Sequence, residues 1–421
     1  MFKPLHVAVA LAATLLLSAC GGGGDDTSEA AGPAAQAEAL ALEGIETPES
    51  AAEARRDPSQ PCSPLVIGSN CASIGGQVRG LNKAGLVLAN RGETIAIAED
   101  ATSFVFPTEW RRRSVYTVTI RRQPAFQQCR LGRARGVVGR SDVTSVRVEC
   151  ADVDAVVTSV ADTQGPTVGA DGAGNVYFAA ANAMVRRAPD GTTVEIPNTS
   201  PFATFAVGRD GSVYTAALFA LLKFSPLGEV TPVVVSGQGP LFDNPAGMAV
   251  GPADEVFVAE FSRDFIRRVS PAGELSVFAQ DLGRPAGLAT DAAGNVYVTD
   301  FARSHVVRIT PTGVRSLLAG CDQFGGSADG TGAAACFYFP EALALDAAGN
   351  VYVADTQNRR VRLITPKGVV TTLAGSGLQS TQDGTGAAAG FVGPSGIAVD
   401  TLGRVFVADG GRIRQIAGLA R

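Results

Sequence analysis

A ten-residue pattern that returns along the last two thirds of the chain restricts its fold more than any other feature. Residues 291–300 (DAAGNVYVTD) return almost unchanged as residues 346–355 (DAAGNVYVAD), and residues 400–409 form a weaker copy. Six copies in all place an aromatic side chain at one position: Tyr177, Tyr214, Phe257, Tyr297, Tyr352 and Phe406. Successive aromatic residues are 37, 43, 40, 55 and 54 positions apart. This period is near the ~40–50 residues of repeats that each contribute one small sheet.

Each repeat predicts four antiparallel strands. In one copy, apolar alternation between Gly-Asn and Pro-x-Gly turns predicts strands at 285–290, 296–299, 306–309 and 314–318. One such sheet buries too little apolar surface alone, so the sheets must pack face to face in a ring. The sixth copy lacks a fourth strand, and residues 155–161 match residues 369–374 of the fifth copy. We therefore expect an all-β fold with a six-bladed β-propeller over 151–421, its last blade closed by the N-terminal strand.

Three motifs within the repeats carry a family resemblance. They are residues 394–400 (PSGIAVD), residues 349–355 (GNVYVAD) and residues 358–362 (NRRVR). Together they resemble the NHL repeat, over about two thirds of the chain and most specifically in the last three copies. The resemblance implies a platform, because propellers of this family most often bind protein, sugar or nucleic acid.

The N-terminal residues predict export and a lipid anchor. Lys3 precedes an uncharged apolar stretch at 7–17, which is too short to span a ~30 Å hydrocarbon core. Residues 17–20 (LSAC) and the four glycines behind them resemble the bacterial lipobox. The resemblance implies a signal peptide at 1–19, acylation of Cys20 and outer-membrane sorting in a Gram-negative cell, facing the periplasm or the exterior. An ordinary secretory signal is the alternative.

Export gives the cysteine count a structural meaning. With Cys20 assigned to the lipid, six cysteines remain, an even number in an oxidising compartment. A zinc site is the alternative, but the chain contains no Cys-x-x-Cys spacing. Proximity in the sequence favours three disulfides: Cys62–Cys71, Cys129–Cys150 and Cys321–Cys336.

Charge divides the part of the chain before the propeller. Residues 21–59 hold nine acidic and two basic side chains and few apolar ones, which predicts a disordered acidic tether over 20–59. Residues 61–150 hold 13 basic and six acidic side chains, and short alternating runs predict a small antiparallel β-sandwich over 60–150, stapled by disulfides. The runs resemble small β-sandwich modules of bacterial surface lipoproteins. The arginines of this sandwich suit contact with an anionic surface polymer, lipopolysaccharide phosphate or extracellular nucleic acid. The alternatives are a solvated face or a dock for the acidic tether.

One face of the propeller is the candidate ligand site. In a four-stranded meander, the loops between second and third strands emerge beside the links between blades, and two long insertions at 317–340 and 373–394 join them. Acidic and basic side chains, with one histidine, recur there: Glu260, Asp300, Arg303, His305, Asp355, Arg359, Arg360, Asp409 and Arg412. They predict a ring around a channel mouth that binds a polar ligand or a cation. The alternative is structural, with each acidic side chain accepting backbone N–H groups of its own turn.

These features predict an envelope-anchored platform for a protein or carbohydrate partner. Export and a propeller with 19 basic and 25 acidic side chains argue against nucleic acid. One alternative is a hydrolase resembling calcium-dependent propeller lactonases, and a purely structural envelope protein is the other. The two Asp-Gly-Thr-Gly segments at 329–332 and 383–386 offer oxygens for calcium or simply turns, and no metal ligand is assigned. The chain lacks a Gly-x-Ser-x-Gly motif and a second mature histidine, so no catalytic residue is predicted.

Overall fold

The computed structural model describes residues 61–62, 71–181, 183–197, 204–217, 219–235, 240–322 and 325–418. All of them belong to one compact unit, Asp57–Arg421. The predicted signal peptide at 1–19, Cys20 and the predicted tether at 20–59 lie outside the described residues. Within the described ranges, no helix is long and apolar enough to cross a membrane.

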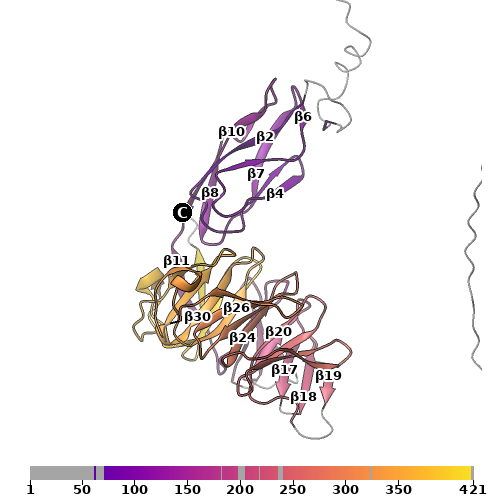
Figure 1. Ribbon diagram of the computed structural model, residues 1–421, viewed down its shortest axis with the longest axis vertical. Coiled ribbons are helices and arrows are strands. Elements are labelled where there is room, and N and C mark those ends of the chain that lie inside the picture. The colour runs from indigo at the N-terminus through magenta and orange to yellow at the C-terminus, as the bar shows by residue number, and fades with distance from the viewer. Residues whose placement is uncertain are drawn as a thin grey trace, which may run out of the picture. The chain divides into compact units, whose positions relative to one another are not determined.

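Residues 71–152 form two four-stranded sheets around one core, and we call them the two-sheet unit (Figure 1). The sheet orders are β5-β2-β10-β8 and β4-β3-β7-β9. The strands are β2 (Ile74–Arg79), β3 (Val87–Asn90), β4 (Glu93–Ala96), β5 (Ser103–Val105), β7 (Val115–Arg122), β8 (Gln127–Gly132), β9 (Arg135–Val137) and β10 (Val143–Asp152). A short pair, β1 (Cys71–Ala72) with β6 (Trp110–Arg111), lies beside them. Apolar side chains such as Ile74, Leu86 and Val146 lie fully buried in the shared core.

The prediction of a purely antiparallel sandwich is wrong at one pair of strands. β10 pairs with β2 in parallel and with β8 in antiparallel orientation, where Cys150 lies opposite Cys129. The chain between β2 and β10 passes through the other sheet instead of a hairpin, so these two strands are free to run in the same direction. The predicted disulfides Cys129–Cys150 and Cys62–Cys71 are both present.

Residues 155–418 fold into six sheets, numbered here along the chain. Sheet 1 consists of β12 (Val168–Ala170), β13 (Val176–Ala179), β14 (Met184–Arg187) and β15 (Thr193–Ile196). Sheet 2 consists of β16 (Phe205–Val207), β17 (Val213–Ala217), β18 (Ala220–Phe224) and β19 (Val230–Val235). Sheet 3 consists of β20 (Pro245–Val250), β21 (Val256–Glu260), β22 (Phe265–Val269) and β23 (Leu275–Ala279). Sheets 4 and 5 consist of β24 (Pro285–Thr290), β25 (Val296–Asp300), β26 (His305–Ile309) and β27 (Arg315–Ala319); and β29 (Pro340–Leu345), β30 (Val351–Asp355), β31 (Arg360–Ile364), β32 (Val369–Ala374) and β28 (Gly330–Thr331). Sheet 6 consists of β34 (Pro394–Val399), β35 (Val405–Asp409), β36 (Arg412–Gly418), β11 (Ala155–Asp162) and β33 (Gly384–Thr385).

The first strands of the six sheets contact one another in a closed ring, which makes this part a β-propeller. β12, β16, β20, β24, β29 and β34 touch in that order, and β34 touches β12. Gly287 allows the close approach of β24 to β29, because an added Cβ would lie 2.6 Å from the Cα of Ala342. The predicted closure by the N-terminal strand is confirmed, since β11 pairs with β36.

The repeated ten-residue pattern forms the turn between the first and second strands and the second strand itself. In sheet 5, Asp346 accepts hydrogen bonds from the backbone N–H groups of Ala348 (2.8 Å) and Asn350 (3.0 Å). Its second oxygen accepts from the amide of Asn350 (2.8 Å) and the hydroxyl of Tyr352 (3.2 Å). Burial and the Asp346 carboxylate raise the pKa of Tyr352 well above its ordinary value, so this hydroxyl stays a donor. The recurring Asp, Asn and Tyr are therefore one hydrogen-bonded unit.

Candidate functional site

The acidic residues predicted to ring the channel mouth each end the second strand of a sheet. They are Glu260, Asp300, Asp355 and Asp409, and all four are buried. Each accepts a hydrogen bond from the backbone of the link that enters its own sheet: Asp243 N to Glu260 (3.2 Å), Gly283 N to Asp300 (2.9 Å), Tyr338 N to Asp355 (2.8 Å) and Val392 N to Asp409 (2.8 Å). Their carboxylates are thus engaged within the protein, and the four donors belong to the links rather than to the turn that each residue begins.

Sheet 5 adds a buried arginine that the sequence did not single out. Arg362, on β31, is fully buried and donates to Asp355 (2.8 Å) and to Asp329 (2.7 Å). It also donates to the carbonyl of Cys336 (3.0 Å), and its guanidinium lies 5.2 Å from the ring centre of Phe337. Burial raises the pKa of Asp355, although the bonds from Tyr338, Asn358 and Arg362 act in the opposite direction. The sequence feature that could have identified Arg362 is the Arg-x-Arg pair at residues 360–362. Its second arginine, Arg362, is fully buried, whereas the predicted Arg360 is only half-buried.

Sheet 6 repeats the same arrangement around Arg414. This fully buried side chain donates to Asp409 (3.3 Å) and Asp383 (2.8 Å), and it lies 5.3 Å from the ring centre of Phe391. Burial tends to raise the pKa of Asp383, but hydrogen bonds from Ser159 and the Arg414 charge lower it overall. Sheets 5 and 6 therefore each bury one guanidinium between two carboxylates.

The two long insertions supply the second carboxylate in each case. Within them, β28 pairs with β32 of sheet 5, and β33 pairs with β11 of sheet 6. Asp329 accepts from Thr372 N (3.1 Å), and Asp383 accepts from Ser159 N (2.9 Å). The Asp-Gly-Thr-Gly segments, predicted to offer oxygens for calcium or to form turns, supply these short fifth strands. We call each Asp-Gly-Thr segment a latch. Within the residues that the structure describes, no group of three or more His, Cys, Asp or Glu is placed to hold a metal.

Sheet 4 brings three of the predicted residues together. Asp300, Arg303 and His305 line a cavity of about 230 Å³ beside β27, and Arg303 donates to Asp300 at 2.8 Å. The Nε2 atom of His305 lies 3.2 Å from the carbonyl of Cys321, whose predicted disulfide with Cys336 is present. The remaining predicted arginines lie apart from this cavity: Arg359 after β30, Arg360 at the start of β31 and Arg412 at the start of β36.

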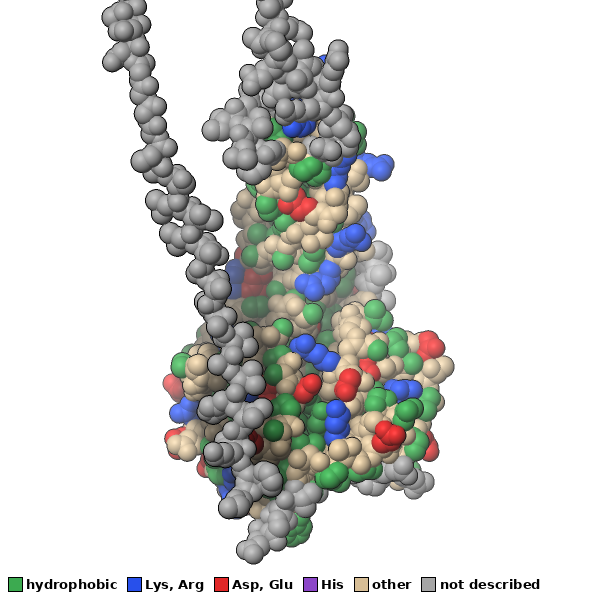
Figure 2. All heavy atoms as spheres, turned by 90° about the vertical axis from the view of Figure 1, so that its right-hand side faces the viewer, with side chains coloured by type: hydrophobic (Ala, Val, Ile, Leu, Met, Phe, Trp, Pro, Cys, Tyr) green, Lys and Arg blue, Asp and Glu red, His purple; other side chains and the backbone are tan. Residues whose placement is uncertain are grey.

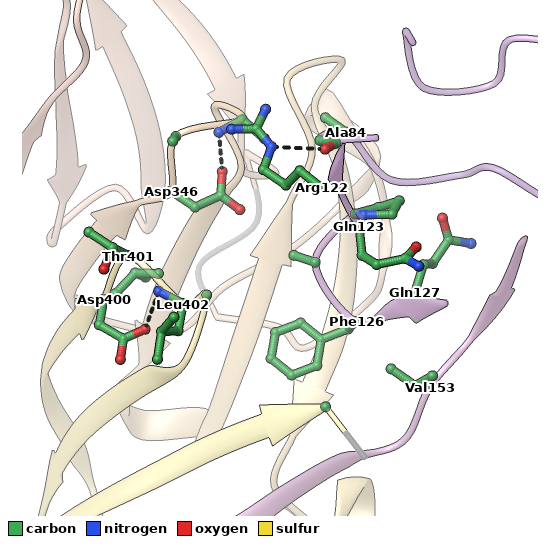
Figure 3. Close-up of a pocket in the computed structure, with 18 of the residues that line it drawn as sticks. Ala84, Arg122, Gln123, Phe126, Gln127, Val153, Asp346, Asp400, Thr401 and Leu402 are labelled. Carbon is green, nitrogen blue, oxygen red and sulfur yellow. Dashed lines mark hydrogen bonds between the residues drawn. The ribbon is translucent and has the colours of Figure 1, made fainter. Parts of the chain in front are cut away.

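A cavity of about 540 Å³ lies on the opposite side of the sheets, where the two-sheet unit meets the turns of sheets 5 and 6 (Figure 3). Arg122 and Gln123 line one wall, and Asp346 and Asp400 line the other. Phe126 projects between them into the core of the propeller, where its ring centre is 6.3 Å from that of Tyr352. The sequence did not predict this cavity, because it depends on contacts between segments that lie far apart in the sequence.

Most polar groups of this cavity have partners within the protein. Asp400 accepts from the backbone of Leu402 (3.0 Å) and from Arg404 (2.6 Å). Arg122 donates through Nε to the carbonyl of Gly85 (3.0 Å). The terminal nitrogens of Arg122 have no hydrogen-bond partner within the described part of the chain. The same is true of the side chains of Gln128 and Thr401. Three side chains therefore offer free donors and acceptors to this cavity.

The arginines of the two-sheet unit lie mostly at its surface. Exposed examples are Arg79, Arg113, Arg121, Arg130, Arg140 and Arg147. On the face drawn in Figure 2, basic side chains are spread among other residues and form no continuous patch. This arrangement suits a solvated face better than a binding stripe for a polyanion.

Comparison with known proteins agrees with the propeller fold. No family model and no curated protein matches the sequence. A protein of unknown function from Bacteroides thetaiotaomicron has a similar structure, with 18% identity over 86% of this chain and 99% of its own, and a TM-score of 0.54. An auxiliary nutrient binding protein from Bacteroides ovatus (16% identity, 86% of this chain, 100% of its own, TM-score 0.52) and another from Bacteroides thetaiotaomicron (14%, 83%, 98%, TM-score 0.50) are also similar. The chain is a β-propeller protein with an additional N-terminal two-sheet unit.

Proposed function

We propose that this chain is a lipid-anchored binding protein of the bacterial envelope, with a six-bladed, NHL-type propeller as its platform. Six repeat copies and six sheets around one ring support six blades. The LSAC segment that ends at Cys20 supports export and a lipid anchor at the outer membrane. Three disulfides suit an oxidising compartment. The partner on this platform is a protein or a carbohydrate.

The observation that carries the binding role is the cavity of about 540 Å³ between the two-sheet unit and the propeller. Small-molecule sites commonly have volumes of about 300–1,000 Å³, lie at domain junctions, and combine apolar walls with a few polar groups. Here Phe126 and Leu402 provide apolar surface, and Arg122, Gln128 and Thr401 provide free polar groups. A small carbohydrate presents the same combination of apolar ring faces and hydroxyl groups. Two proteins of similar structure are nutrient binding proteins by name, which agrees with this role.

The hydrolase alternative has less support. A lactonase-like centre would need several oxygen ligands around a cation in the central channel. The cavity of about 300 Å³ there is lined by one acidic side chain, Asp171. Its oxygens accept hydrogen bonds from Ala173 N (2.9 Å), Asn175 N (2.8 Å) and the Tyr177 hydroxyl (2.9 Å). A binding role is therefore the better-supported proposal.

The test is calorimetric titration of the full chain with a panel of mono- and disaccharides. We expect Arg122→Ala and Gln128→Ala each to weaken binding of a saccharide that binds the wild type, by about tenfold. Arg121→Ala is the matched control, because Arg121 is the exposed neighbour of Arg122 and does not line the cavity. Equal losses for Arg121→Ala and Arg122→Ala would contradict the cavity site. Stoichiometric calcium together with lactone hydrolysis would favour the alternative.

A further inference from the structure

The outer edges of the propeller sheets differ along the chain. In sheets 5 and 6 a latch pairs with the outermost strand: β28 with β32, and β33 with β11. In sheets 1 to 4, no strand of the described chain pairs with the outer edge of β15, β19, β23 or β27. An unpaired edge is a template for another extended segment.

The latches of sheets 5 and 6 contact their sheets in the same way. Gly330 lies opposite Val370 in sheet 5, and Gly384 lies opposite Val157 in sheet 6. The aspartate just before each glycine then reaches the buried arginine of the third strand, at 2.7 Å in sheet 5 and 2.8 Å in sheet 6. Each sheet thus holds an extended segment by backbone pairing and by one side chain placed over the third strand.

The same place in sheet 4 has different chemistry. Strand register makes Val307 the counterpart of Arg362, because Val307 lies opposite Leu317 and Arg362 lies opposite Thr372. An arginine and a threonine that hold an aspartate are therefore replaced by two aliphatic residues. Instead of a latch, sheet 4 has the cavity of about 230 Å³, lined by Val307, Leu317 and Leu282 and rimmed by polar residues.

Two features of sheet 4 keep this edge accessible. Leu317 is 45% exposed and Val314, just before β27, is 62% exposed. The link that enters sheet 4, residues 280–284, is short and contains no latch. Arg315 also lines the cavity, and its guanidinium is held there because it donates to the carbonyls of Gln280 (2.9 Å) and Asp281 (3.0 Å).

We propose that the outer edge of β27 binds an extended segment of a partner polypeptide by strand addition, with an aliphatic side chain of that segment in the cavity between Val307, Leu317 and Leu282. This inference rests on the proposed binding role and specifies a polypeptide partner for this edge. The carbohydrate cavity between the two-sheet unit and the propeller is a separate site. The chain itself supplies the precedent, since it adds such a segment to each of the next two sheets.

The test uses two fluorescent peptides and the full chain. One peptide has the sequence of residues 325–334, which includes the sheet 5 latch, and the other carries the substitution Asp329→Leu. In fluorescence anisotropy we expect the Asp329→Leu peptide to bind about tenfold more tightly than the unsubstituted peptide. In the Val307→Arg variant the preference should reverse, because sheet 4 then offers the guanidinium that sheet 5 offers to Asp329.

Two proline variants distinguish binding at the edge of β27 from binding elsewhere on the propeller. Leu317→Pro removes one backbone donor of the edge and should abolish binding, while Val277→Pro at the corresponding position of β23 should not. Thermal melting checks that both variants fold. The proposal would be overturned if neither peptide bound or if the Val307→Arg variant kept the wild-type preference. It would also be overturned if light scattering showed that the chain is a dimer and that Leu317→Pro dissociates this dimer. Saccharide titration of the same preparation reports on the proposed binding role independently.

Discussion

Sheets 4 and 5 are neighbours with nearly identical repeats, yet they stabilise their outer edges in opposite ways. Sheet 5 buries Arg362 between two carboxylates and covers its edge with a latch. Sheet 4 has Val307 at the same position and a cavity in which aliphatic residues lie beside Arg303, His305 and Arg315. A buried guanidinium tolerates only a segment that brings a carboxylate, because an unpaired buried charge is costly. Sheet 4 has no buried guanidinium at this position, so the same repeat occurs with an edge covered by a latch and with an edge that no described strand covers.

The largest expected effect is the loss of the buried arginine. Arg362→Leu leaves Asp355 buried without its counter-charge, and we expect a loss of about 3–5 kcal/mol in the free energy of unfolding. Urea denaturation measures it. Arg308→Leu, at an exposed position of β26 in sheet 4, is the control and should change stability by less than about 0.5 kcal/mol. Similar losses in the two variants would mean that the pairing of Arg362 has no special role.

The disulfide of the first insertion gives the next largest effect. Cys321 and Cys336 are 15 residues apart, and replacing both with serine should cost about 3 kcal/mol through the freed loop. The second insertion, which precedes sheet 6, contains no cysteine. Proteolysis of the double variant should therefore cleave the first insertion at a rate closer to that of the second. Unchanged protection would show that the first latch is held without the disulfide, by its pairing with β32 and by the contacts of Asp329.

The sequence was sufficient for those parts of the fold that depend on local patterns. The repeated Asp-x-x-Gly-Asn turn, the alternation of each strand and the match between residues 155–161 and 369–374 predicted the sheets and the closure by β11. The latches were missed because a two-residue strand such as β28 has no periodicity to detect. The burial of Arg362 and the cavity beside Phe126 depend on contacts between distant segments, which one sequence does not encode visibly.

Sheets 4 and 5 also differ in their first strands, β24 and β29. Glu341 at the start of β29 in sheet 5 corresponds to Ala286 in sheet 4, and burial raises the pKa of Glu341 from 4.5 to about 6. A raised folded-state pKa means that stability is fully present below the unfolded value of 4.5 and falls as the pH rises through about 6. Because the side chain keeps some contact with solvent, we expect a loss of only about 1 kcal/mol. Urea denaturation between these pH values should show a flatter dependence in Glu341→Gln, and an unchanged slope would contradict this.

The smallest effect concerns the hydroxyl groups that hold each latch. Thr372 donates through Oγ1 to Asp329 (3.0 Å), and Ser159 donates through its hydroxyl to Asp383 (3.1 Å). Thr372→Val keeps the shape of the side chain and should cost about 0.5–1 kcal/mol, as a single hydrogen bond at a partly exposed site does. Thr371→Val is the neighbouring control. If Thr372→Val instead lost as much stability as Arg362→Leu, the threonine of the edge strand would hold the latch as strongly as the buried guanidinium does. The difference between sheets 4 and 5 would then depend on Leu317, the counterpart of Thr372, instead of Val307, the counterpart of Arg362.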